Sequence, residues 1–156
     1  MPIKRITPQI VIQRAIEMRI ERVIAATVRR LCSIGEQVVT YARDPNRKRY
    51  TDRTGNLTSS IGYAVIMDGE IMQHSGFGTV RGPEFKKSKG KESGSKSGRQ
   101  LLAQLISEYQ SGIVLIVVAG MSYAVHVEAK GLDVLDSAEI KAQDLVRKFL
   151  DKFNLK

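Results

Sequence analysis

The first quarter of the chain carries one long amphipathic pattern. Apolar side chains recur at spacings of three and four residues from residue 8 to about residue 42, and Arg and Glu occupy positions between them. This spacing is typical of one face of a helix. Thr7-Pro8 is a typical helix start, because Thr can cap free N–H groups and Pro suits the first helical position. The stripe consists of Ile16, Ile20, Val23, Thr27, Leu31, Ile34, Val38 and Tyr41.

This helix is too long for a small domain to bury along its whole length. About 35 residues at a rise of 1.5 Å per residue span about 50 Å, which exceeds the diameter of a small domain. Ile12, Ile24 and Val28 widen the apolar stripe on one flank. Either the helix bends near Gly35, or part of it projects from the domain and packs on another subunit. We expect the second arrangement.

The middle of the chain predicts a helical turn followed by a β-hairpin. Asp44-Pro45-Asn46 ends the long helix, and a basic loop follows it. In residues 54–61, Thr, Asn and Ser side chains can cap one helical turn, with Leu57 and Ile61 facing inward. The alternation and the turn residues that come next predict a hairpin. Its parts are a strand at residues 62–67, a turn at Asp68-Gly69 and a return strand at residues 70–73.

Residues 78–99 predict a flexible loop that is rich in Lys, Ser and Gly. Residues 86–98 consist of five Lys, four Ser, three Gly and one Glu, so no apolar side chain is available to anchor them. A segment of this composition does not bury enough apolar surface to fold by itself. We therefore expect a mobile loop within a single domain that covers residues 1–156.

The last third of the chain predicts a short helix, a buried strand and a terminal helix. Residues 100–110 are amphipathic, with Leu101, Leu105 and Tyr109 on the inner side. The apolar run at residues 113–119 has the length of a buried strand. The terminal helix is expected to run to about Phe153, and Asp136-Ser137-Ala138-Glu139 has the spacing of a capping box at its start.

The segment before the terminal helix is harder to assign. Residues 121–128 fit either a strand or an irregular turn. In a strand, the alternation would bury Tyr123, Val125 and Val127 and would turn His126 and Glu128 outward. Residues 132–135 resemble a short edge strand. The order of elements contains no βαβ alternation, which predicts an α+β fold. Its parts are a long N-terminal helix, a small antiparallel sheet with a β-hairpin, a short middle helix and a C-terminal helix.

Composition narrows the class of protein. The chain is 42% hydrophobic, which is enough for a core, and its single cysteine, Cys32, excludes a disulfide framework and a multi-cysteine zinc site. One cysteine also points to a reducing compartment. No apolar run approaches the roughly 18 residues of a membrane span. Gln13, Arg14 and Glu17 interrupt the apolar start and disfavour a signal peptide. We expect a soluble, intracellular protein with no membrane partner.

Charge is distributed unevenly along the chain. The net charge is +9, of which residues 1–54 carry +7 and residues 81–99 carry +5, whereas residues 100–156 carry −1. A basic excess of this kind suggests a polyanion nearby. The lysine-rich loop has three interpretations: a solvated linker, a non-specific phosphate contact, or a segment that orders on a partner. The lysines concerned are Lys86, Lys87, Lys89, Lys91 and Lys96.

Few residues suggest catalysis. His126-Val127-Glu128 matches part of a zinc-deaminase motif, but that chemistry needs cysteines in addition to Cys32. Glu128-Ala129-Lys130 resembles half of a metal-dependent nuclease centre, in which the acid holds Mg²⁺ and the Lys positions water. No well-placed second carboxylate accompanies it, so surface charge is the better interpretation. We predict a protein that is not an enzyme and that uses no metal and no cofactor.

Two short stretches, at residues 54–61 and residues 122–131, together resemble a known family. They read TGNLTSSI and SYAVHVEAKG. A long N-terminal helix, a "TGxLxxSI" stretch, a hairpin, a "YAxyVExG" stretch and a terminal helix are similar, in this order, to the small minor tail components of tailed bacteriophages. These proteins are also described as head–tail joining, neck or tail-completion proteins. The matching residues are Thr54, Gly55, Leu57, Ser60, Ile61, Tyr123, Ala124, Val127, Glu128 and Gly131.

The resemblance implies a function and a set of partners. It implies a virion or prophage structural protein that joins head to tail or completes the tail, forms a homo-oligomeric ring and contacts other neck or tail proteins. Such a protein would be found in the virion, and in the host cytoplasm before assembly. If the ring encloses the DNA passage, the loop lysines could line it. The alternative is a non-specific nucleic-acid-binding protein that uses the basic helix and the lysine loop.

Overall fold

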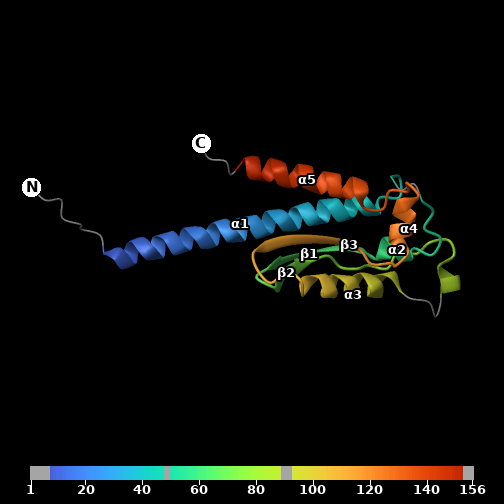
Figure 1. Cartoon of the computed structure of the whole chain (residues 1–156), viewed down its shortest axis with the longest axis horizontal. Helices are drawn as coiled ribbons and strands as arrows, with labels where there is room; N and C mark the ends of the chain where they lie inside the picture. Colours follow the sequence, from blue (N-terminus) through green and yellow to red (C-terminus); the bar gives the residue numbers. More distant parts are fainter. Residues whose placement is uncertain (1–7, 48–49, 89–92, 153–156) are drawn as a thin grey trace, which may run out of the picture.

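The computed structural model describes residues 8–47, 50–88 and 93–152, and the predicted α+β fold is confirmed (Figure 1). Long helices and a small antiparallel sheet occur in the expected order. The residues predicted as the start and the end of the two terminal helices, Thr7 and Phe153, lie outside the described residues. The elements are α1 (Gln9–Arg43), α2 (Asn56–Ser59), β1 (Ile61–Met67), β2 (Glu70–His74), the 3₁₀ turn η1 (Phe85–Ser88), α3 (Gly94–Ile106), β3 (Ile113–Ala119), α4 (Ala124–Ala129) and α5 (Asp136–Asp151).

The sheet has three antiparallel strands in the order β2-β1-β3, so β1 is its central strand. β1 and β2 form the predicted hairpin, with Asp68 and Gly69 at φ values of 51° and 83° in the turn. Positive φ at both central residues matches the right-handed twist of the two strands. β1 is almost completely buried, whereas every residue of β2 is exposed. β3 pairs with β1 on the other side, and its outer edge is an edge of this sheet.

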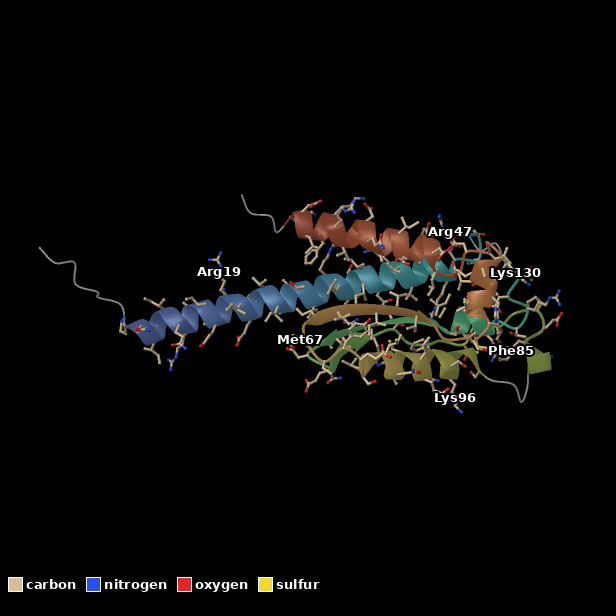
Figure 2. All side chains as sticks on the ribbon, viewed as in Figure 1. Arg19, Arg47, Met67, Phe85, Lys96 and Lys130 are labelled. Carbon is tan, nitrogen blue, oxygen red and sulfur yellow. The ribbon has the colours of Figure 1, made fainter. Side chains whose placement is uncertain are left out.

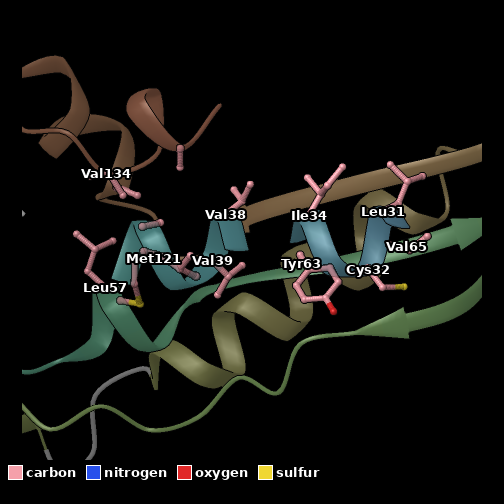
Figure 3. Packing of buried hydrophobic residues seen from close by; sticks show 14 of the residues in the cluster. Leu31, Cys32, Ile34, Val38, Val39, Leu57, Tyr63, Val65, Met121 and Val134 are labelled. Atoms are coloured by element: carbon pink, nitrogen blue, oxygen red, sulfur yellow. The ribbon is translucent and has the colours of Figure 1, made fainter. Parts of the chain in front are cut away.

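Helices cover both faces of this sheet. Side chains of β1 alternate between the faces: Tyr63 and Val65 pack with α1, whereas Ala64 and Ile66 pack in the cluster that includes α3. This alternation follows from strand geometry. α5 lies alongside the C-terminal half of α1 and runs back along it (Figure 1). Figure 3 shows side chains of α1 in the larger core beside Tyr63 and Val65.

α1 is a single continuous helix of 35 residues, and it does not break at Gly35. Its N-terminal half extends past the sheet, as Figure 1 shows. Gly35 is required for packing rather than for a bend: a Cβ at this position would lie 2.4 Å from the Tyr63 ring. The helix ends at Arg43, before Asp44 and Pro45, as predicted.

The predicted loop at residues 78–99 is wrong in its C-terminal part. α3 begins at Gly94 instead of residue 100, and it ends at Ile106, so that Tyr109 is exposed rather than inward-facing. Small residues allow this start, because a Cβ on Gly94 would lie 1.9 Å from the Asn56 carbonyl oxygen and a Cβ on Gly98 would lie 2.5 Å from the Phe77 ring. Close packing of Gly and Ser against neighbouring backbone therefore replaces the apolar anchor that the composition lacks.

Residues 121–128, which fitted either a strand or an irregular turn, are mainly helical, and the edge strand expected at residues 132–135 does not form. Residues 124–129 are the helix α4, and Val125 is 72% exposed. The Glu128 carboxylate accepts hydrogen bonds from the backbone N–H groups of Val134, Leu135 and Asp136, at 3.0–3.1 Å for the shortest contact to each. These bonds fold the segment back onto α4, and they serve the first turn of α5 in place of the predicted capping box. No side-chain cap bond forms at the residue preceding α5.

Candidate assembly interface

Residues 9–30 of α1, here called the projecting segment, extend for most of their length beyond the sheet and α5, and their last turns reach the core, where Val28 packs (Figures 1 and 2). Most of its side chains are exposed, and six large apolar ones are 46–58% exposed. No other described part of the chain covers them. Clustered exposed apolar side chains mark contact sites on soluble proteins, and a helix of this kind gains most of its stability from packing. The six are Ile10, Val11, Ile16, Met18, Ile20 and Val23.

The apolar stripe of the projecting segment continues into the core of the protein. At 3.6 residues per turn, Ile16, Ile20 and Val23 fall on the same side of the helix as Ile34 and Val38. Ile34 and Val38 are completely buried in the core cluster that α1, the sheet and α5 form. One face of α1 is therefore covered at its C-terminal end and uncovered at its N-terminal end.

The two flanks of this stripe differ in charge. Helical geometry places Arg19 and Arg30 along one flank, with Arg22 further round on the same side. The opposite flank carries Gln13 and Glu17, and Gln13 Nε2 donates a hydrogen bond to Glu17 Oε1 at 3.3 Å. A partner that covers the stripe would therefore meet a basic flank on one side and a polar to acidic flank on the other.

A second uncovered apolar surface lies between α5 and β3. It is a groove of about 400 Å³. The side chains of β3 that face it are only half-buried, because α1 covers the central strand more completely than this edge strand. α5 contributes small side chains and two polar ones. The groove is lined by Val38, Leu115, Val117, Leu135, Ala138, Ala142 and Val146, with Glu139 and Gln143 as the polar members.

The motif at residues 54–61 is a tightly packed turn. Gly55 has a φ of +81°, and a Cβ there would lie 2.1 Å from the Val80 carbonyl oxygen, so glycine is required at this position. Leu57 and Ile61 are buried, as predicted. These residues therefore shape the fold.

Asp52 holds this turn in place, and the sequence analysis missed it. Its carboxylate accepts hydrogen bonds from the Gly55 N–H at 2.9 Å, the Thr58 N–H at 2.8 Å and the Thr58 hydroxyl at 2.6 Å. The available signal was the position of Asp52 three residues before a glycine, from which an Asp side chain can bond later backbone N–H groups. In the same turn, the Thr54 hydroxyl accepts a hydrogen bond from the Asn56 N–H, and the Ser60 hydroxyl donates one to the Leu57 carbonyl.

The second motif lies close to the first. Gly120, just before it, donates its N–H to the Ser60 carbonyl at 3.1 Å, and α4 stands near α2 in Figure 1. Ala124 is buried in the larger core, and Val127 packs against that core. Tyr123 is partly exposed, contrary to the expectation of a buried strand face. Gly131 ends α4 with a φ of +70°.

Exposed basic residues gather at the end of the molecule opposite the projecting segment. Figure 2 shows Arg47, Lys130 and Phe85 at this end. The Arg81 guanidinium lies 5.4 Å from the centre of the Phe85 ring. We call this the basic end; its residues are Arg47, Arg53, Arg81, Lys86 and Lys130.

The structure locates part of the predicted lysine group. Lys86 and Lys87 are residues of η1, where Lys86 is exposed. Lys96 is exposed on α3. Lys89 and Lys91 lie outside the described residues. The basic end therefore combines Lys86 with residues that the sequence analysis did not group together. They come from separate loops and from the residue after α4, so their proximity depends on the fold.

Comparisons with protein-family models, curated proteins and solved structures give no match for this chain.

Burial and a neighbouring carboxylate shift the pKa values of several groups in this protein. Burial raises the pKa of the Cys32 thiol and raises the pKa of Tyr50 to about 12. The nearby Glu128 carboxylate is the main cause that raises the pKa of Asp136. Among the described residues, no group of three His, Cys, Asp or Glu side chains is arranged to hold a metal, and no helix is long and apolar enough to cross a membrane.

Proposed function

We propose that this chain is a structural protein of a tailed-bacteriophage or prophage virion, and that it joins head to tail or completes the tail as a homo-oligomeric ring. The projecting segment is the observation that carries this proposal, because its apolar stripe needs a covering surface from another chain. The family resemblance at residues 54–61 and 122–131 suggests the class of assembly. The protein would act by assembly, without catalysis or a cofactor, in the host cytoplasm first and then in the virion.

Assembly would use surfaces that the single chain leaves open. The projecting segment offers apolar side chains, and the exposed strand β2 and the outer edge of β3 offer strand edges. Contacts between different surfaces of identical subunits close into a ring when the rotation between neighbours permits it. Other neck or tail proteins would bind the two faces of the ring.

The test uses the full chain and the phage that encodes it. Sedimentation velocity over a range of concentrations, followed by negative-stain electron microscopy, is expected to show self-association and closed rings. Deletion of the gene from the encoding phage is expected to give separate heads and tails or incomplete tails. A chain that stays monomeric at every concentration, together with normal particles from the deletion phage, would overturn the proposal.

The second candidate is non-specific binding of nucleic acid, and the basic end favours it. Arg47, Arg53, Arg81, Lys86 and Lys130 present positive charge near the turns that carry the motifs. Contacts of this kind bind phosphates and release counterions, so the affinity falls steeply with salt. In the ring, this end would face the DNA passage. Fluorescence anisotropy with duplex DNA at several salt concentrations tests this, and a salt-independent or undetectable affinity would exclude it.

A further inference from the structure

We propose that the projecting segment of one copy docks in the groove between α5 and β3 of a second copy of this chain. This inference rests on the proposed function, because it specifies how neighbouring subunits in the oligomer contact one another. Each copy has one uncovered apolar stripe and one uncovered apolar groove, on different parts of its surface. A contact between two different surfaces passes from copy to copy, which is the type that closes into rings.

The chain already shows that this helix face suits this surface. Val38, on the same face of α1 as Ile16 and Ile20, packs with β3 and α5 side chains and lines the groove itself. Docking would therefore repeat, between copies, a type of packing that exists within each copy. Ala142 in the groove is small enough to let a second helix approach closely.

The projecting segment is long enough to cover the groove. Residues 9–30 span about 33 Å as a helix, and the 16 residues of α5 span about 24 Å. The docked segment can therefore cover the whole length of the groove. It would also cover Leu115 and Val117, which the single chain leaves half-buried.

Charge favours the groove over pairing of two projecting segments. In an antiparallel two-fold pair, each flank of a helix faces the same flank of its partner, so Arg19 and Arg30 would face Arg19 and Arg30 of the other copy. Like charges that face one another across a helix pair repel. The groove instead carries the Glu139 carboxylate, and the docked segment is oriented so that its basic flank meets this opposite charge.

Disulfide trapping tests the contact in the full chain. In a Cys32→Ala background, Ile20→Cys combined with Ala142→Cys is expected to give a ladder of covalent oligomers that extends beyond the dimer and contains most of the protein. The matched control combines Ile20→Cys with Arg99→Cys, which is exposed on α3. It is expected to give only traces of cross-linked chain. Equal ladders from both pairs would overturn the inference.

The single variant Ile20→Cys distinguishes docking in the groove from self-association through another contact. If it alone gives abundant covalent dimer, the projecting segments pair with each other, so the docking inference fails while self-association stands. If the wild-type chain is monomeric by sedimentation velocity at every concentration, both proposals fail.

Charge exchange provides an independent test if the cysteine variants do not fold. Arg19→Glu and Glu139→Arg are each expected to weaken self-association roughly two- to five-fold, and the double variant is expected to restore it. A double variant that associates more weakly than either single variant would contradict the contact.

Discussion

α1 is one helix with one apolar stripe, but its two halves have different surroundings. In residues 31–43, the stripe meets the sheet on one side and α5 on the other, and Ile34 and Val38 are completely buried. In the projecting segment, the same stripe continues with Ile16 and Ile20 about half exposed. The side chains are of the same kind, so the difference comes from where the rest of the fold ends.

The buried side chains of α1 stabilise the folded chain, whereas the exposed ones in the projecting segment remain available for contact with another chain. Burying an Ile or Val side chain stabilises a protein by about 1.5–3 kcal/mol. The C-terminal half of α1 gains this free energy during folding of the chain, whereas the projecting segment can gain it only from a second surface. Substitutions in the two halves should therefore separate the free energy of unfolding from the free energy of association.

The largest expected contrast comes from the same substitution in each half. Ile34→Ala should lower the free energy of unfolding by about 2–5 kcal/mol, because it leaves a cavity in the core. Ile16→Ala should change it by less than about 0.5 kcal/mol, because it is a surface substitution in the single chain. Urea unfolding of dilute, monomeric protein measures both values.

Self-association should show the opposite order. Ile16→Ala is expected to weaken it in sedimentation velocity, whereas the folded fraction of Ile34→Ala is expected to retain it. Equal destabilisation by the two substitutions in dilute protein would mean that the projecting segment is already buried within the subunit.

Gly35→Ala sharpens the comparison at the centre of the buried half. Alanine is favoured over glycine in a helix by about 1 kcal/mol, but the added Cβ would lie 2.4 Å from the Tyr63 ring. Overpacking of this kind costs about 1–3 kcal/mol, so the substitution should destabilise the protein in urea. Ala25→Gly in the projecting segment is the control: it should reduce helicity in circular dichroism without moving the unfolding midpoint. A more stable Gly35→Ala protein would contradict the packing.

The elements that the sequence predicted well depend on local patterns. α1, the hairpin and β3 follow from the spacing of apolar residues and from Asp68-Gly69, and each lies within a residue or two of its expected bounds. The periodicity of α1 could not show where the sheet and α5 stop covering it, because this depends on the lengths of those elements. The expectation that part of the helix projects came from its length alone.

The errors occur where side chains bond backbone groups or where small residues pack against backbone. The start of α3 depends on the approach of Gly94 to Asn56, which is 38 residues earlier in the chain. Lys96, which was expected in the flexible loop, lies on α3 for the same reason. The segment between α4 and α5 is held by the Glu128 carboxylate, which would lie on the outer surface if residues 121–128 formed a strand.

Glu128→Ala tests how firmly α5 covers the buried half of α1. The substitution removes the acceptor for three backbone N–H groups at the start of α5, so it should cost about 1–2 kcal/mol, as the loss of a helix cap does. Glu128→Gln keeps one carbonyl oxygen and is the control, with a smaller expected loss. Hydrogen exchange should show faster opening of α5 in the alanine variant, whereas unchanged exchange there would show that packing alone positions this helix.

The smallest expected effect concerns Tyr63, which lies beneath Gly35 in the buried half. Its hydroxyl donates a hydrogen bond to Glu36 Oε1 at 2.9 Å, so Tyr63→Phe should cost about 0.5–1.5 kcal/mol at neutral pH. Burial, followed by the interaction with Glu36, raises the pKa of Tyr63 above its ordinary value of 10.0. Because the folded-state pKa lies above the unfolded one, the contribution of Tyr63 is complete below pH 10 and is lost as the pH rises further.

The free energy of unfolding of the wild-type protein should therefore fall more steeply than that of Tyr63→Phe as the pH rises above about 10. Tyr50, whose pKa burial raises to about 12, contributes an alkaline loss that both proteins share, so the difference between the two curves isolates Tyr63. Tyr109→Phe, at an exposed position after α3, is the control and should follow the wild-type curve. Parallel curves for wild type and Tyr63→Phe would show that the Tyr63 hydroxyl is solvated, and that the buried half of α1 is less tightly packed on the sheet than its contacts indicate.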